Sequence, residues 1–249
     1  MNRFANQWSI GIFSVRGFSL AELAVVLFIM GLLLQASIEP LSTGLEHKRR
    51  AHAGAQLTQV REHLRAYWVS YGHLPCPISA GAVGVTGGLA SAQSAGCELG
   101  VGGVPAAALG IVGARNSAGE LLDPWGGVLK YAVSLTDVNA TDVANTPDWL
   151  TQGELSQVTF TELQADLVVC HEAAPGGCTT SNNTIADLVA IVVSSGSKES
   201  PREQDNNDAD LQYISAPYSL AQPHEFDDQL IWVGRSEFIY LALQAGWIP

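Results

Sequence analysis

The chain has 249 residues and a formal net charge of −12, with 47% hydrophobic and 14% charged residues. This length allows one globular domain of ordinary size in addition to a long helix. Seven of the twelve Lys and Arg residues precede position 66, and from there on five basic residues face twenty acidic ones. Such an acidic domain repels nucleic acid at neutral pH, so we expect no direct nucleic-acid binding.

The first informative stretch is Arg16-Gly17-Phe18-Ser19-Leu20-Ala21-Glu22, which is followed by an apolar run to Ile38. Glu22 is the only charged residue from Phe18 to Ile38. About 20 apolar residues in a helix span the hydrocarbon core of a bilayer, so we predict a transmembrane helix over 18–38. An ionised acid in a membrane helix costs roughly 2.5–3.5 kcal/mol near the bilayer centre, which indicates that Glu22 has a partner.

A cut between Gly17 and Phe18 would create that partner, because the new amino group lies one helical turn before Glu22. Groups at positions i and i+4 face each other on a helix, and their pairing offsets the desolvation of both charges. Two other interpretations remain open. One is an ordinary signal peptide, for which Leu34-Gln35-Ala36 supplies only one of the two small residues at a cleavage site. The other is a simple signal anchor in which Glu22 has no role.

The stretch from Gly17 to Glu22, followed by Leu23-Ala24-Val25-Val26-Leu27, resembles the processing site of type IV prepilins and of type II secretion pseudopilins. The resemblance implies that prepilin peptidase removes a leader of residues 1–17, that Phe18 becomes the N-methylated first residue, and that Glu22 guides subunit docking. It implies a pilin-like α+β fold, in which a long N-terminal helix with a membrane half and an amphipathic half packs on an antiparallel β-sheet. The partners it implies are other pilin subunits, prepilin peptidase, the membrane before assembly, and an inner-membrane assembly platform.

The amphipathic continuation of the helix is expected over 39–72. Glu39-Pro40 predicts a kink or a short melted stretch, since proline removes a backbone donor and clashes with the preceding turn. Apolar residues then recur at spacings of three and four, which predicts a stripe that packs on a globular domain. The stripe comprises Leu57, Val60, Leu64, Tyr67, Trp68 and Tyr71.

The globular domain is expected over 73–249. We interpret its Gly-rich stretch from Ala80 to Gly119 as loop. Asp123-Pro124-Trp125-Gly126 predicts a turn before a strand, and this turn is similar to the one that opens the sheet in major pseudopilins and several minor pilins. A helix is expected from Ser236 to Gln244, with Ser236 as N-cap and Gly246 as its stop. Short apolar runs predict further strands at 129–135, 158–160, 167–170, 188–193 and 230–233.

Four cysteines follow the apolar segment, which suits a periplasmic domain, since disulfides form in that compartment. Three pairings are possible, and we expect the local one: Cys76 with Cys97, and Cys170 with Cys178. The competing interpretation is a zinc site that includes His73 and His171, although the spacings match no paired CxxC pattern.

An acidic loop after a Val-rich run is the candidate cation site. Hard oxygen ligands for calcium are supplied within six residues by Asp205, Asn207, Asp208 and Asp210. Asp227-Asp228 lies close downstream. The position of the loop resembles the calcium-binding loop of major pseudopilins, but the ligand spacing departs from it and there is no EF-hand frame. A solvated acidic turn is the other interpretation.

The sequence contains no GxSxG, HExxH or phosphate-loop motif, so we expect no enzymatic activity. The expected function is that of a minor pilin in a type IV pilus-like filament, and a pseudopilin of a type II secretion system is the alternative. From another class, an adhesive or ligand-binding tip subunit is considered, for which Trp149 and its loop are the only hint. We expect the chain in the inner membrane with its C-terminal domain in the periplasm, and then in the pilus or pseudopilus filament.

Overall fold

The computed structural model describes residues 17, 19–78, 97, 100–137, 147–156, 158–171, 184–198, 203–206, 210–222 and 224–247; at 34–42 and at Asp205 it describes the backbone alone. The chain divides into two compact units, Met1–His47 and Lys48–Pro249. Helix α1 (Leu20–Tyr71) has residues in both units.

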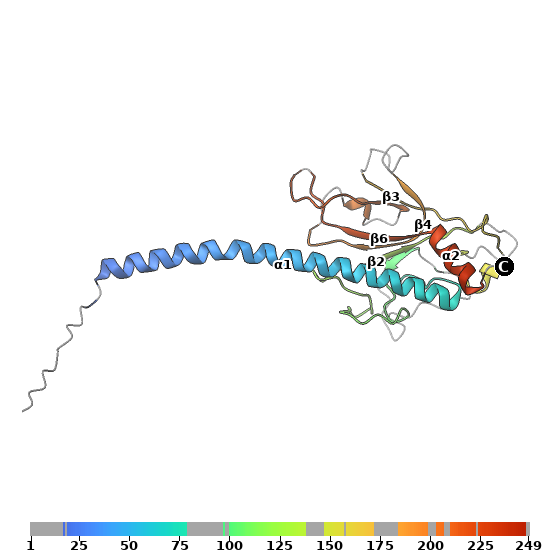
Figure 1. Ribbon diagram of the computed structural model, residues 1–249, viewed down its shortest axis with the longest axis horizontal. Coiled ribbons are helices and arrows are strands. Elements are labelled where there is room, and N and C mark those ends of the chain that lie inside the picture. Colours follow the sequence, from blue (N-terminus) through green and yellow to red (C-terminus); the bar gives the residue numbers. More distant parts are fainter. Residues whose placement is uncertain are drawn as a thin grey trace, which may run out of the picture. The chain divides into compact units, whose positions relative to one another are not determined.

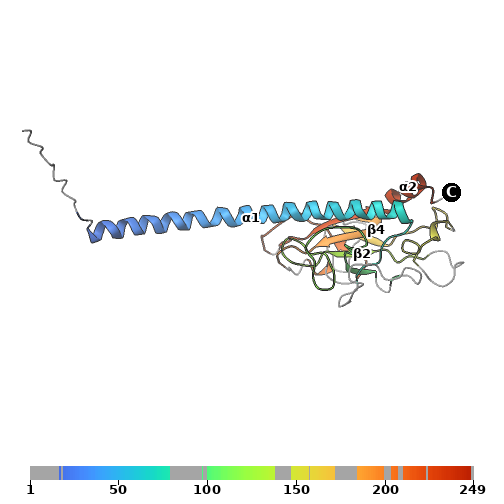
Figure 2. The same ribbon diagram turned by 90° about the horizontal axis from the view of Figure 1, so that it is seen from below.

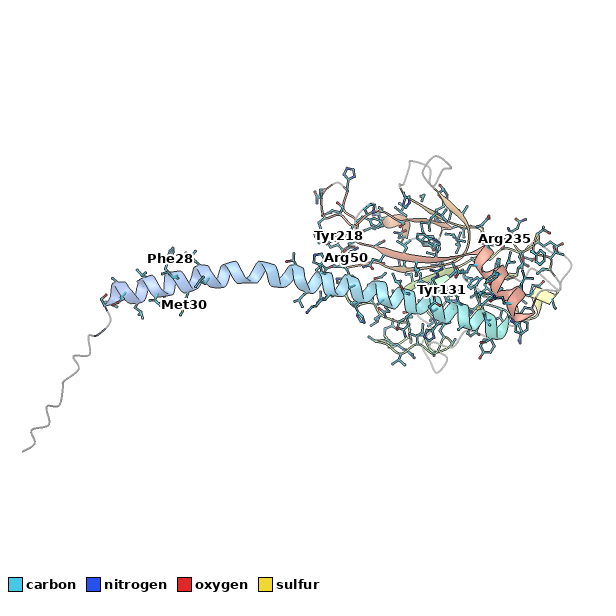
Figure 3. The ribbon with its side chains drawn as sticks, in the orientation of Figure 1. Phe28, Met30, Arg50, Tyr131, Tyr218 and Arg235 are labelled. Atoms are coloured by element: carbon cyan, nitrogen blue, oxygen red, sulfur yellow. A yellow bond between two sulfur atoms is a disulfide. The ribbon has the colours of Figure 1, made fainter. Side chains whose placement is uncertain are left out.

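In the first unit, the described part of α1 exposes apolar side chains on all sides. The exposed fractions reach 88% at Leu20 and 68% at Phe28. Phe28 and Met30 point to opposite sides of the helix (Figure 3). The helix is continuous through Pro40, so the short melted stretch expected at Glu39-Pro40 is not formed.

In the second unit, α1 buries one stripe of side chains. Leu57, Val60, Leu64 and Trp68 are each at most 2% exposed, which confirms most of the predicted stripe. Tyr71, in the last turn, is 52% exposed and lies outside the core. Figure 2 shows this part of α1 lying over one face of a β-sheet.

The sheet has six strands within the described residues: β1 (Val101–Gly103), β2 (Lys130–Val133), β3 (Leu167–Cys170), β4 (Ile185–Ser194), β5 (Gln212–Ile214) and β6 (Gln229–Gly234). The longest strand, β4, pairs antiparallel with β2, β3 and β6. Strand β1 pairs antiparallel with β2, and β5 pairs parallel with β3. Two short 3-10 helices, η2 (Glu154–Ser156) and η3 (Gln204–Asn206), lie in the connections.

Helix α2 (Arg235–Ala245) follows β6 directly and lies beside the end of α1 (Figure 1). Its N-cap is Gly234 rather than the predicted Ser236. Its stop is the predicted Gly246, whose φ of 75° lies in the left-handed region that favours glycine. Two backbone hydrogen bonds satisfy carbonyls of the last turn: Gly246 N–H donates to Leu243 O, and Trp247 N–H donates to Ala242 O.

An aromatic cluster joins α1, α2 and the 147–150 turn. The ring of Trp68 stacks on Phe238 at 5.1 Å and lies 5.4 Å from the ring of Trp149. Trp68 Nε1–H also donates to Phe238 O at 3.0 Å. Trp149 is fully buried in this cluster, so the sequence hint of an exposed aromatic ligand site at Trp149 is wrong.

Polar contacts hold α2 and the C-terminal segment on α1. Glu237 pairs with Arg61 at 2.9 Å and with Arg65 at 3.1 Å. Trp247 Nε1–H donates to Val69 O at 2.9 Å, and the Trp247 ring lies against Gly72. These contacts connect residues about 170 positions apart in the chain.

A disulfide joins Cys76 to Cys97, as the local pairing predicts. Because the Cys76 sulfur is oxidised, no thiolate is present there for the zinc site considered above. Cys170 is also disulfide-bonded. Its expected partner, Cys178, lies outside the described residues.

The turn at Asp123 forms as predicted and is attached to the sheet. Asp123 Oδ1 accepts the N–H groups of Trp125 and Gly127 at 3.0 and 2.8 Å. Ser194 Oγ–H, at the end of β4, donates to Asp123 Oδ2 at 2.8 Å. The buried carboxylate therefore fixes the entry to β2.

The expected fold is wrong in three respects. The sheet is not antiparallel throughout, because β5 returns in the direction of β3 after a long crossover that contains β4. In the part of the chain that is described, no helix combines the length and the apolar character that crossing a bilayer requires, so the expected membrane half is not found. The predicted strand at 158–160 is also absent, since Thr159 N–H and Oγ–H both bind the Glu162 carboxylate at 2.8 Å and form a turn.

We predict that Ser194→Ala lowers the free energy of unfolding by about 1–2 kcal/mol, because the buried Asp123 carboxylate loses one of its donors. Ser156→Ala, which removes an exposed hydroxyl bound to Gly153 O, is the matched control and should change it by less than about 0.5 kcal/mol. Urea unfolding of the two variants and the parent chain measures the difference. Equal effects of the two substitutions would contradict the structural role of the Asp123 turn.

Candidate functional site

The start of α1 places Ser19 and Glu22 in a local capping arrangement. Glu22 N–H donates to Ser19 Oγ at 3.2 Å, and Leu23 N–H donates to Ser19 O at 3.1 Å. Ser19 therefore acts as the N-cap, and Glu22 lies three residues later, where glutamate favours the helix start. Gly17 is exposed, and Phe18 lies outside the described residues. Glu22 thus has a local role that the sequence interpretation did not include.

A second site is a cluster of three buried carboxylates in the second unit. Glu203, Asp227 and Asp228 are 1%, 3% and 5% exposed. One oxygen atom of each lies within 4.8 Å of the others. Glu203 directly precedes η3, and the two aspartates directly precede β6. The cluster therefore joins two loops that β5 separates in the chain.

Backbone and side-chain donors hold the Asp227 carboxylate in place. Its Oδ2 accepts Ser197 N–H and Ser197 Oγ–H at 2.9 Å each, and Lys198 N–H at 3.2 Å. The loop approaches so closely that a Cβ on Gly196 would lie 2.4 Å from Asp227 Oδ1. Gly196 also has a φ of 65°, so both the space and the backbone conformation require glycine there.

Glu203 and Asn206 connect the second loop to the aspartates. Glu203 Oε1 accepts the N–H groups of Asp227 and Asp228. Asn206 is fully buried and donates to Asp228 Oδ2 at 2.8 Å and to Ile214 O at 3.0 Å. Its Oδ1 accepts Ile214 N–H at 2.7 Å, so Asn206 links the cluster to β5.

Two carboxylate oxygens in the cluster, Asp227 Oδ1 and Asp228 Oδ1, have no hydrogen-bond partner among the described residues. An unpaired buried charge is costly, and a divalent cation is one way to compensate it. Burial raises the pKa of Asp228 from 3.8 to about 7, with repulsion from Glu203 and Asp227 added and with opposing contributions from Asn206 and Lys130. The donor set consists of hard oxygens and fits calcium better than a soft metal.

The structure brings together a different set of residues from those predicted as calcium ligands. Asp210 is exposed, and its Oδ1 accepts Gln212 N–H at 2.7 Å, which makes it part of a turn. Asn207, Asp208 and the side chain of Asp205 lie outside the described residues. The sequence pointed to the region and to Asp227-Asp228, but it missed Glu203 and Asn206. A usable signal was the acidic pair directly before an apolar strand, a position where carboxylates become buried.

A groove of about 810 Å³ lies between the start of β4, β6 and α2. Its lining includes Phe160, Trp232 and Tyr240 together with Arg61, Arg235 and Glu237. Arg61 pairs with Glu237, and Arg235 donates to Phe160 O and Leu163 O, whereas Asp187 in β4 is exposed. The groove therefore offers an apolar surface without a convergent set of free polar groups.

Comparison of the chain with models of known families, with curated proteins and with solved structures finds no match.

We predict that Asp228 makes the metal-free protein less stable as the pH rises. Its pKa is raised on folding, so the folded state binds the proton more tightly, and stability falls between pH 4 and pH 7 as the proton is lost. The shift corresponds to on the order of 4 kcal/mol at pH 8. Asp228→Asn removes this ionisation and keeps the size of the side chain, so the variant should be more stable than the parent at pH 8 in a chelator.

Urea unfolding at pH 5 and pH 8 measures this prediction, and Asp210→Asn is the exposed control. The stability difference between Asp228→Asn and the parent should grow with pH, whereas Asp210→Asn should show no such trend. A pH-independent difference for Asp228→Asn would show that Asp228 does not titrate in this range.

Proposed function

We propose that the chain is a structural subunit, a minor pilin, of a type IV pilus-like filament, and that prepilin peptidase cuts it between Gly17 and Phe18. The observation that carries this proposal is the start of α1. An apolar helix with side chains exposed on all sides begins within a Gly-Phe-Ser-Leu-Ala-Glu sequence. A surface of this kind needs cover from other molecules, and helices of like subunits supply it.

The proposed role of Glu22 follows from its position. After cleavage, the amino group of Phe18 would lie one helical turn before Glu22, and in a packed array of helices the same carboxylate reaches the terminus of a neighbour. The desolvated pair then offsets the cost of each charge. Before assembly, we propose that the subunit is associated with the inner membrane and its assembly platform, with the disulfide-bonded domain in the periplasm.

A pseudopilin of a type II secretion system is the second candidate. The turn at Asp123-Pro124-Trp125-Gly126 is compatible with either candidate, because it is similar to the one in major pseudopilins and in several minor pilins. Both candidates require the same cleavage and the same packing of α1. Disruption of each filament system in turn, followed by detection of the chain in sheared filaments, distinguishes them.

The carboxylate cluster supports a further part of the proposal, namely that Glu203, Asp227 and Asp228 hold calcium. Three carboxylates supply part of the six to eight oxygens that calcium takes, and water or backbone carbonyls supply the others. The flexible geometry of calcium suits ligands from two separate loops better than the strict octahedron of magnesium does. In the subunit, the ion would stabilise the loops that precede β5 and β6.

We predict that the mature chain begins at Phe18 and that Glu22→Gln leaves this cleavage intact but lowers incorporation into filaments at least tenfold. Glutamine at this position keeps the capping arrangement with Ser19, so the variant tests the charge alone. Glu62→Gln, on the exposed face of α1, should assemble like the parent. Mass spectrometry of the mature N-terminus and quantification of sheared filaments are the measurements. Retention of residues 1–17, or normal assembly of Glu22→Gln, would overturn the proposal.

We predict that calcium raises the melting temperature of the full-length chain and that Glu203→Gln abolishes this effect, because the neutral amide removes one of three carboxylate ligands. Asp210→Asn, which alters only the exposed turn, is the matched control and should respond to calcium like the parent. Calorimetric titration with calcium and with magnesium gives the affinities. An equal loss of binding in Asp210→Asn would favour the ligands predicted from the sequence.

A further inference from the structure

Arg50 is the side chain through which the start of the second unit reaches the carboxylate cluster. It lies on α1 two residues after the unit begins at Lys48. Its Nη1–H donates to Asp227 O at 2.9 Å, and its guanidinium lies 3.8 Å from the centre of the Tyr218 ring. Figure 3 shows Arg50 and Tyr218 next to each other at one end of the unit.

The two partners of Arg50 belong to one hairpin-like segment. Ser219 and Phe226 form an antiparallel bridge, with hydrogen bonds of 3.0 Å and 2.8 Å between their backbones. Tyr218 directly precedes this bridge and Asp227 directly follows it. Arg50 therefore contacts both ends of the segment 218–227, through Tyr218 before the bridge and Asp227 after it.

Asp227 has two functions in this arrangement. Its carbonyl oxygen accepts from Arg50, while its carboxylate lies in the cluster and its N–H donates to Glu203. A backbone movement at Asp227 that separates the three carboxylates also moves the acceptor of Arg50. One residue thus couples the spacing of the cluster to the attachment of α1.

We propose that a divalent cation at Glu203, Asp227 and Asp228 controls how firmly the first turns of α1 in the second unit are held, with Arg50 and Tyr218 as the connection. The inference rests on the proposed calcium site. With the ion bound, the carboxylates converge and Asp227 O stays in reach of Arg50. Without it, their repulsion separates the two loops, and the first turns of α1 lose their contact with the 218–227 segment.

The coupling is reciprocal, because a contact that is made only in the closed state must also favour cation binding. Arg50→Gln removes the charge that contacts Tyr218 and Asp227, and Tyr218→Leu removes the aromatic face but keeps an apolar side chain. Both variants should bind calcium about three- to tenfold more weakly than the parent. Neither residue belongs to the carboxylate cluster, so a direct loss of ligands does not explain such an effect.

The test is hydrogen exchange of the full-length chain in calcium and in EGTA, read by mass spectrometry on peptides from 48–56 and from 60–68. We expect calcium to slow exchange at least tenfold in 48–56 and to leave 60–68, which includes the fully buried Val60, Leu64 and Trp68, almost unchanged. Arg50→Gln and Tyr218→Leu should lose this protection at saturating calcium. Arg65→Gln, which contacts Glu62 and Glu237, is the matched control and should keep it.

The outcomes separate this inference from the proposals on which it depends. Calcium binding by calorimetry without a change in exchange at 48–56 would overturn the coupling and leave the calcium site in place. No calcium binding would overturn both. Neither result bears on the filament proposal, which depends on cleavage at Phe18 and on Glu22.

Discussion

The burial of a single stripe of α1 against the sheet is the constraint on which the second unit depends. Leu57, Val60, Leu64 and Trp68 recur every three or four residues and are almost completely buried. Trp68 is the centre of this contact, because its ring stacks on Phe238 of α2 and its Nε1–H donates to the same residue. Replacing a core aromatic residue of this size by alanine lowers the free energy of unfolding by about 3–5 kcal/mol. The sheet, α2 and the 147–150 turn therefore share one anchoring point on the helix.

Against this apolar core, the carboxylate cluster is an electrostatic exception. Three acidic side chains that are nearly inaccessible to water lie together, and two of their oxygens have no partner among the described residues. Structure formation alone does not favour such a group, since desolvation and mutual repulsion both act against it. A bound ion would supply the positive charge that compensates the three carboxylates. The cluster then stabilises the fold only while an ion is bound, whereas the contacts around Trp68 need no ligand.

Local sequence signals predicted much of the second unit. The stripe on α1 follows from apolar periodicity, strand β3 and the cores of β4 and β6 follow from short apolar runs, and the stop of α2 follows from Gly246. Local sequence signals did not predict the elements that form only by pairing with a distant segment. Strand β1 consists of Val101, Gly102 and Gly103, whose composition indicates a loop, and it becomes a strand because it pairs with β2 and, at Gly103, with Ile78. The parallel pairing of β5 with β3 has no local signature either. The ligands Glu203 and Asn206 were missed for the same reason, since only the fold brings them to Asp227 and Asp228.

The contacts between the two ends of the second unit have a consequence for biosynthesis. The stripe on α1 leaves the ribosome early, whereas Phe238, Glu237 and Trp247, which cover its last turns, are translated about 170 residues later. Contacts of such long sequence separation are slow to form, and until they do an apolar helix surface stays accessible to aggregation. In a nascent chain, the stripe on α1 therefore stays uncovered until α2 and Trp247 have been made.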